Sequence, residues 1–369
     1  MNKIRIPWWE PRVGKKEKEL VNQVLQSNFL NDGKYTEKFE NEIARLVNSR
    51  YAVSVTSGTA AMFLSLKALG IGYLDEVIIP DMTFIATANA VEMCGAKPVL
   101  VDVNSQGLII TSSIKKAINK KTKAIIPVHV SGRGADMRSI IKIAKEHKLF
   151  IVEDAAEAFM SKQAGKFLGT FGNMGCFSFS PPKIITTGQG GMIVTDNKKF
   201  YSQLRELKDQ GRPNRGTGGD DIHLSVGYNF KFTNLQAAVG LGQLSYLRAR
   251  IKRVTQINKL YRKYLSGVKE ISIFDIDLKN GGLPLWTDCL VSRKDELVNF
   301  LRSKGVDCRK FWFPLHTQKP YRTSDEAFPN SSKLSQKALW LPSAFTITDT
   351  DVKHVCKLIK KFLEDEKST

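Results

Sequence analysis

Phe150-Ile-Val-Glu-Asp154 is a short apolar run that ends in two acids. It is the last of five such runs along the chain, the others being residues 51–55, 77–80, 98–101 and 124–128. The runs are continuously apolar rather than alternating, and helical segments separate them, which is typical of strands buried on both faces. The pattern therefore predicts an α/β fold with a mostly parallel sheet flanked by helices.

The pattern changes after Asp154. Residues 177–179 and 192–195 look like hairpin-type strands on either side of a loop that contains Lys183. From Leu235 onward, we expect a long helical stretch that leads into a second unit. That unit has the pattern of a small α+β domain, with a strand at 285–291, a helix at 294–303, a connector rich in proline and aromatic residues at 311–329, and a closing helix at 349–363.

The length of 369 residues favours two domains. We expect a large domain of residues 1–248, which includes two amphipathic helices near its start, and a smaller C-terminal domain of residues 249–369. Residues 211–221 are rich in glycine and charge, which predicts a mobile surface loop.

The composition is ordinary for a globular protein, with 42% hydrophobic and 25% charged residues. No run of 18 apolar residues is present, so we expect no membrane span, and the first ten residues lack the apolar segment of a signal peptide. The five cysteines form no CxxC pair, which predicts neither a metal site nor a disulfide framework. Together these features favour a cytoplasmic protein.

The net charge of +20 raises the question of an anionic partner. The basic residues are spread along the chain, and no zinc finger, RNP-like motif or basic low-complexity arm accompanies them. A lysine-rich solvated surface is therefore favoured over nucleic-acid binding. A small substrate that carries phosphate is compatible with the charge.

Two residues on either side of the pattern change have chemically complementary side chains. Asp154 lies at the carboxyl end of an apolar strand, where parallel sheets bind ligands. Lys183 follows two prolines in a loop of small and polar residues. An acid that pairs with a pyridine nitrogen and a lysine that forms a Schiff base are what pyridoxal phosphate (PLP) needs from a protein. The alternatives are a helix N-cap for Asp154 and a surface position for Lys183.

Other residues would complete such a site. Thr56-Ser-Gly-Thr59 joins a strand to a helix N-terminus, which is a natural phosphate cradle. Phe84 can stack on a ring, and Ser178 can donate a hydrogen bond to a phosphate. Each signal alone has an ordinary alternative, which is a strand–helix turn, a core phenylalanine or a strand serine, respectively. No metal-binding constellation accompanies them.

The order of these motifs resembles the DegT/DnrJ/EryC1/StrS sugar aminotransferases, which belong to the fold-type I PLP class. The resemblance covers nearly the whole chain, and its motifs begin at Thr56, Pro80, Val152, Phe177, Gly188, Gly227, Phe313 and Leu341. It implies a seven-stranded, mostly parallel sheet and a smaller C-terminal α+β domain. Residues 183–192, Lys-Ile-Ile-Thr-Thr-Gly-Gln-Gly-Gly-Met, are most similar to the perosamine-synthase branch.

The resemblance also implies a role for individual residues. Lys183 would be the catalytic lysine that holds the cofactor, and Glu157 would lie near the phenolic oxygen of PLP. Asp154 would pair with the pyridine nitrogen, Phe84 would stack on the ring, and Gly58, Thr59 and Ser178 would hold the phosphate. Asn229 would reach the PLP phosphate of a neighbouring subunit, which implies a homodimer. His316 would either contact the sugar or serve in packing.

The function implied is transfer of the amino group of L-glutamate to a nucleotide-linked 4-keto-6-deoxy sugar, as in surface polysaccharide biosynthesis. Relatives that act as dehydratases have histidine in place of the lysine, so Lys183 favours transamination. One alternative is amination at C3 of the sugar. Another is a non-enzymatic PLP-binding sensor or regulator, although no DNA-binding segment is appended.

Overall fold

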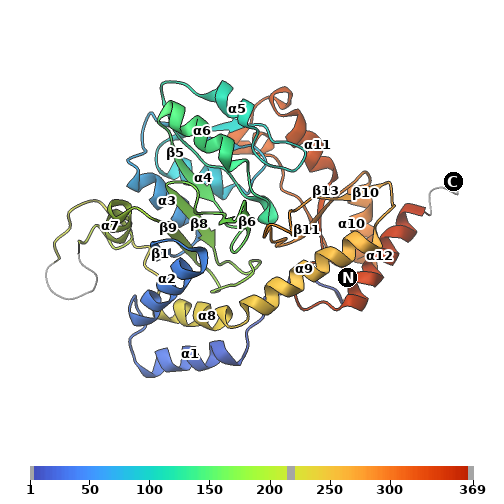
Figure 1. The fold of residues 1–369 in the computed structure, drawn as a ribbon, viewed down its shortest axis with the longest axis horizontal. Coiled ribbons are helices and arrows are strands. Elements are labelled where there is room, and N and C mark those ends of the chain that lie inside the picture. The colour runs from blue at the N-terminus through green and yellow to red at the C-terminus, as the bar shows by residue number, and fades with distance from the viewer. Residues whose placement is uncertain (1–3, 214–220, 365–369) are drawn as a thin grey trace.

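The computed structural model describes residues 4–213 and 221–364 (Figure 1). A large α/β part contains the N-terminal half of the chain, and a smaller α+β part is built from the C-terminal third. The predicted surface loop at 211–221 falls mostly on residues that are outside the described ranges. Among the described residues, no helix is long and apolar enough to cross a membrane, and the five cysteines are free and buried.

The large part is built on a seven-stranded sheet. In spatial order its strands are β1 (Tyr51–Val55), β9 (Gly191–Thr195), β8 (Met174–Ser178), β5 (Phe150–Asp154), β4 (Thr122–Ile125), β2 (Glu76–Pro80) and β3 (Lys97–Val101). Only β9 runs against its neighbours, because it pairs antiparallel with both β1 and β8. The predicted seven-stranded, mostly parallel sheet and the predicted pairing of the strands around Lys183 are confirmed.

Helices cover both faces of this sheet. They are α2 (Lys34–Val47), α3 (Gly58–Ala68), α4 (Ala86–Met93), α5 (Thr111–Ala117), α6 (Met137–His147) and α7 (Lys198–Leu207). Successive residues of one strand show the two faces: Val77 and Ile79 pack into the apolar cluster that contains α3 and α4, whereas Ile78 packs into the cluster that contains α5 and α6. This double burial explains why the strands are apolar without alternation.

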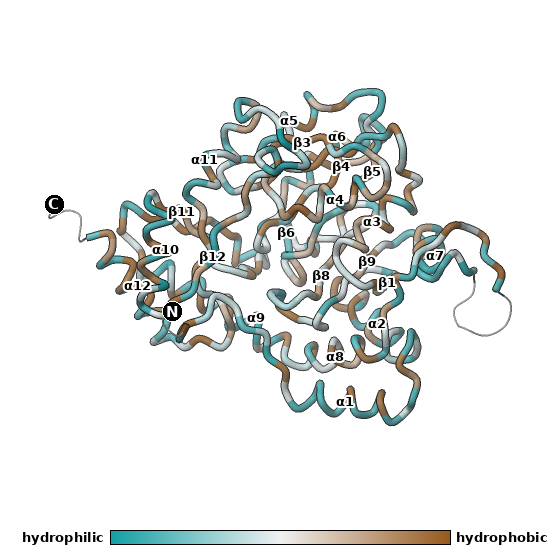
Figure 2. Tube along the Cα trace, turned by 180° about the vertical axis from the view of Figure 1, so that it is seen from behind, coloured by the Kyte–Doolittle hydropathy of each residue, from teal (hydrophilic) through white to brown (hydrophobic). Residues whose placement is uncertain are grey.

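Three helices lie along one side of the molecule, and the last of them leads to the small part (Figure 2). α1 (Lys15–Gln26) packs against α8 (Asn234–Leu244), and α9 (Leu247–Tyr264) continues from α8 (Figure 2). The long helical stretch that the sequence predicts is therefore two helices, with Ser245 and Tyr246 between them. A short hairpin of β6 (Lys162–Gln163) and β7 (Lys166–Phe167) follows β5.

The small part has a four-stranded antiparallel sheet in the order β10 (Ile271–Ile273), β11 (Thr287–Val291), β13 (Ala338–Leu341) and β12 (Arg309–Lys310). Its helices are α10 (Lys294–Ser303), α11 (Pro329–Lys337) and α12 (Asp349–Glu364). The start of the chain also lies here, since Ile6 bridges to Val306 and packs in the small part's apolar cluster. The division at residue 248 stays a prediction.

Candidate active site

A cavity of about 280 Å³ opens at the carboxyl ends of β5 and β8, beside the N-terminus of α3. Seven of the nine predicted site residues line it, namely Gly58, Thr59, Phe84, Asp154, Glu157, Ser178 and Lys183. Asn229 and His316 are not among its lining residues. The fold thus brings together segments that are more than 100 residues apart in the sequence, at the edge of the sheet where α/β proteins bind ligands.

Asp154 is the last residue of β5 and is only 6% exposed. Its carboxylate accepts hydrogen bonds from the Thr87 hydroxyl at 2.8 Å and from the Ala156 backbone N–H at 3.2 Å. Burial raises the pKa of Asp154, and the hydrogen bonds from Thr87 and Ala156 oppose this rise. A cationic partner in the cavity would stabilise the ionised form of a carboxyl group in such a position.

Thr87 was not predicted from the sequence as a site residue. It lies one turn after Thr83, and the two hydroxyls are 2.9 Å apart. The motif that carries Phe84 also contains Thr87, but nothing in the sequence shows that its hydroxyl reaches a strand 67 residues away. α4 begins at Ala86, two residues after Phe84, because its first helical hydrogen bond runs from Asn89 N–H to the Ile85 carbonyl.

Lys183 lies in the loop between β8 and β9. Its Nζ is 3.5 Å from Glu157 Oε1 and 5.1 Å from the centroid of the Trp286 ring. The other oxygen of Glu157 accepts a hydrogen bond from the Ser131 backbone N–H at 3.1 Å. Burial raises the pKa of Glu157, while the charge of Lys183 opposes that rise. The amine is thus held beside an acid in a largely buried position.

The N-terminus of α3 lies at one end of the cavity. Ser57 caps this helix, since its hydroxyl accepts a hydrogen bond from the Ala60 N–H at 3.1 Å. Gly58 begins the helix, and a Cβ there would come within 3.1 Å of Ser178 Cβ, so the absence of a side chain lets β8 approach. The Ser178 hydroxyl donates to Ser180 Oγ at 3.3 Å. Helix N–H groups and hydroxyls together suit a phosphate.

The small part contributes a wall of aromatic residues to the cavity, and no sequence motif predicts this wall. Trp286, Trp312 and Trp340 line the cavity together with Arg309. Phe84 lies on the large-part side and leaves 53% of its surface exposed. The indoles come from strands and connectors that reach the cavity only when the small part packs on the large one.

His316 is completely buried. Its Nδ1 lies 2.7 Å from Asp81 Oδ2, its backbone N–H donates to Asp81 Oδ1 at 2.8 Å, and its ring stacks on Phe328. These contacts tie the connector of the small part to the loop after β2, and they favour the packing alternative. The contact of His316 with a sugar stays a prediction.

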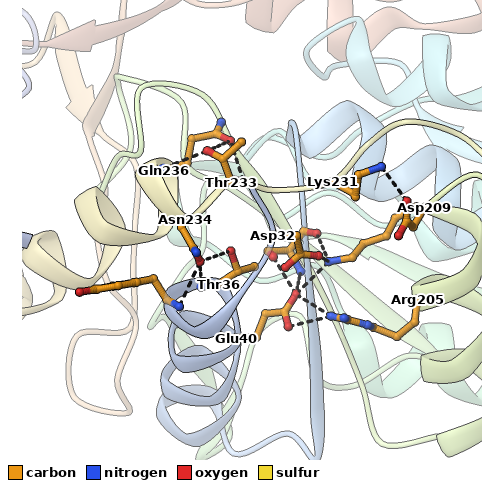
Figure 3. A network of polar contacts seen from close by, with 12 residues as sticks. Asp32, Thr36, Glu40, Arg205, Asp209, Lys231, Thr233, Asn234 and Gln236 are labelled. Carbon is orange, nitrogen blue, oxygen red and sulfur yellow. Dashed lines mark hydrogen bonds and ion pairs between the residues drawn. The ribbon is translucent and has the colours of Figure 1, made fainter. Parts of the chain in front are cut away.

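Asn229 is exposed, and its segment pairs with the chain at the end of α7, where Asn229 bridges to Asp209. Figure 3 shows the polar network around this segment. Lys231 pairs with Asp209 at 2.6 Å, and the buried Lys208 contacts Glu40 and Asp32, both at 3.2 Å. The network holds the segment in place, while the contact of Asn229 with a neighbouring subunit stays a prediction.

The fold and this cavity define an enzyme of the aminotransferase class, and the comparisons with known proteins identify the family. The chain belongs to the DegT/DnrJ/EryC1/StrS aminotransferase family, whose pattern it matches over residues 11–360. It is 37% identical to GDP-perosamine synthase of Escherichia coli O157:H7, over 98% of this chain and 99% of the relative. It is 34% identical to GDP-perosamine synthase of Vibrio cholerae, over 97% and 99% of the two chains.

Solved structures agree with this assignment. The structure of S. venezuelae DesV in complex with a ketimine intermediate is 30% identical in sequence, with a TM-score of 0.89 over 94% of each chain. The aminotransferase TlmJ from Streptoalloteichus hindustanus is 27% identical, with a TM-score of 0.92 over 98% of this chain and 100% of that one. The predicted family, fold class and class of enzyme are confirmed.

Proposed function

We propose that this protein transfers the amino group of L-glutamate to C4 of a nucleotide-linked 4-keto-6-deoxy sugar, with PLP as its cofactor. The observation that carries the proposal is the placement of Lys183, Asp154 and the N-terminus of α3 around one cavity. The similarity to proteins named GDP-perosamine synthase over nearly their whole length supports this choice of substrate. It also supports a role in the biosynthesis of a surface polysaccharide.

The residues of the cavity fit PLP. A buried carboxylate with a raised pKa is suited to the protonated nitrogen of a pyridine ring, and Asp154 is such a group. The backbone N–H groups of Gly58 and Thr59, with the hydroxyl of Ser178, suit its phosphate. Phe84 offers an exposed face for the ring, and Lys183 offers the amine that PLP chemistry needs.

PLP, when bound, supplies an electron sink for bond changes at the carbon that carries the amino group. In this proposal Lys183 moves a proton to and from that carbon through its Nζ. Glu157 lies 3.5 Å from this Nζ and orients it. Asp154 would hold the protonated ring nitrogen of the cofactor in place, assisted by the hydroxyl of Thr87. The three indoles of the small part exclude water from the reacting atoms.

The two substrates use one cavity in turn, so we expect a double-displacement reaction with parallel double-reciprocal lines. We further propose that the active form is a cytoplasmic homodimer in which Asn229 contributes to the neighbouring site. The exposure of Asn229 and the polar network beneath its segment support this arrangement.

Replacement of Lys183 tests the proposed activity. In Lys183→Ala, we expect turnover to fall by about a thousandfold or more, because the proton has no carrier. The matched control is Lys120→Ala, which removes an exposed lysine outside the cavity and should leave turnover unchanged. The measurement is mass spectrometry of products from a panel of nucleotide keto sugars with glutamate.

Three outcomes of this experiment would count against the proposal. If the purified protein takes up no PLP, the proposed cofactor is wrong. Amination at C3 rather than C4 would favour the alternative substrate. PLP binding without turnover of any sugar would favour a sensor or regulator.

A further inference from the structure

A second cavity of about 380 Å³ adjoins the first one. The two share Thr83, Phe84, Arg309 and Trp312 as lining residues. Arg309 lies on the short strand β12 and therefore stands where the cavity that contains Lys183 meets its neighbour. A substrate that extends from Lys183 toward the second cavity passes this side chain.

Arg309 differs from the other cations around these cavities. Lys183 pairs with Glu157 at 3.5 Å, Arg302 with Asp307 at 3.5 Å and Lys310 with Asp295 at 2.8 Å. Arg309 is exposed, and over the described ranges 4–213 and 221–364 no ion pair or hydrogen bond joins its guanidinium to another residue. It is thus a positive charge in the cavity wall whose in-plane donors are not used within the chain.

Two indoles hold this guanidinium in place. Its central carbon lies 5.0 Å from the centroid of the Trp8 ring and 5.5 Å from that of Trp340. Both tryptophans are buried, so they form a rigid floor. Cation–π stacking engages the flat face of the guanidinium and leaves its N–H edges free, and these edges match the two oxygens of a carboxylate or phosphate.

We propose that Arg309 is the residue that binds an oxyanion of the substrate in this active site. The proposal rests on the proposed function, in which both substrates carry such a group. L-Glutamate has carboxylates, and the nucleotide-linked sugar has a diphosphate. Because the two substrates occupy the cavity in turn, the same guanidinium is available to each of them.

Separate half-reactions test the proposal and identify the oxyanion. The PLP form is mixed with glutamate, and the pyridoxamine phosphate form with the keto sugar, while the cofactor absorbance reports each conversion. In Arg309→Met, we expect the half-saturating concentration of one or both substrates to rise about tenfold to a hundredfold, the usual effect of losing a charge-assisted hydrogen bond. A rise for glutamate alone identifies the carboxylate, and a rise for the sugar alone identifies the diphosphate. Arg309→Lys keeps the charge and should recover part of the loss.

Non-reacting anions provide a readout that needs no turnover. Glutarate and pyrophosphate are titrated into the PLP-loaded protein by calorimetry, and Arg309→Met should weaken binding of one of them about tenfold. The control is Arg322→Met, an exposed arginine that lines neither cavity and should bind both anions as the parent does. Unchanged half-saturation in both half-reactions, with unchanged anion binding, would overturn the proposal. This result is distinguishable from a failure of the proposed function, which would leave the parent protein itself inactive toward the sugar.

Discussion

Asp154 is buried at the end of a central strand, and its carboxylate accepts hydrogen bonds from Thr87 and Ala156. Burial disfavours the charged form, and the pKa of Asp154 is raised as a result. A protein that places an acid in this way loses stability when the acid ionises without a partner. The proposed function accounts for this position, because the protonated pyridine nitrogen of PLP would be a cationic partner for Asp154.

This environment predicts a pH dependence of stability in the cofactor-free protein. The raised pKa means that native Asp154 keeps a proton which the unfolded chain has already released, so the free energy of unfolding falls as pH rises from about 4 toward the raised value. In Asp154→Asn this contribution is absent and the fall should be shallower. Urea denaturation over a series of pH values, followed by tryptophan fluorescence, measures the difference.

Glu42→Gln is the control for this experiment, because Glu42 lies near the surface in an ion pair with Arg45. It should follow the parent curve. If the free energy of unfolding falls with the same slope against pH in Asp154→Asn and in the parent, the raised pKa of Asp154 is contradicted.

At the scale of elements, Glu153 joins β5 to the segments around it. Its Oε1 accepts from the backbone N–H groups of Phe171 and Gly172, both at 2.6 Å, and its Oε2 accepts from Gly169 N–H at 2.8 Å. The fourth contact is His129 Nε2 at 2.9 Å. Because His129 Nδ1 accepts from the Ala135 N–H, the ring proton lies on Nε2 and is donated to Glu153.

Glu153→Gln should therefore destabilise the protein by about 3 kcal/mol or more, since a side-chain NH₂ would face backbone donors in a fully buried position. Chemical denaturation at pH 7 measures the loss. Glu146→Gln, on the exposed side of α6, is the control and should change stability by less than about 0.5 kcal/mol. A loss below about 1 kcal/mol for Glu153→Gln would show that this cluster does not secure β5.

Element prediction succeeded where a local signal was strong. α10 and the strand at 150–154 have the predicted bounds, because periodicity and continuous apolar runs mark them clearly. β10, β12 and α11 were not predicted. They are short, and β12 exists only through its pairing with β13, about 30 residues later. Such elements depend on long-range contacts that a local pattern does not contain.

At the scale of the whole molecule, one buried ion pair joins the large and small parts. Arg133, which follows β4, contacts Asp288 of β11 at 2.5 Å, and both side chains are almost inaccessible. The guanidinium of Arg133 also lies 4.7 Å from the Phe274 ring centroid. Burial raises the pKa of Asp288, and the charge of Arg133 opposes that rise. The pair thus holds the aromatic wall of the small part against the cavity.

Removal of one partner should be more harmful than removal of both. We expect Arg133→Met to cost about 3–5 kcal/mol, because Asp288 would remain buried without its cation. The double variant Arg133→Met with Asp288→Leu should recover much of that stability. Equilibrium denaturation of the two single variants and the double variant measures the coupling. Additive losses would contradict the role of this pair.

The sequence by itself determined the class of fold, the family and seven of the residues that line the cavity. It could do so because buried strands, capped helices and the cofactor-binding motifs are local patterns with a characteristic order. The tertiary structure alone decided that Thr87 reaches Asp154 and that Trp286, Trp312 and Arg309 complete the cavity. It also decided that His316 is buried against Asp81. The contact of Thr87 with Asp154 forms within the large part, and the others arise when the small part packs on the large one. Side chains so far apart in sequence have no local signal for their proximity.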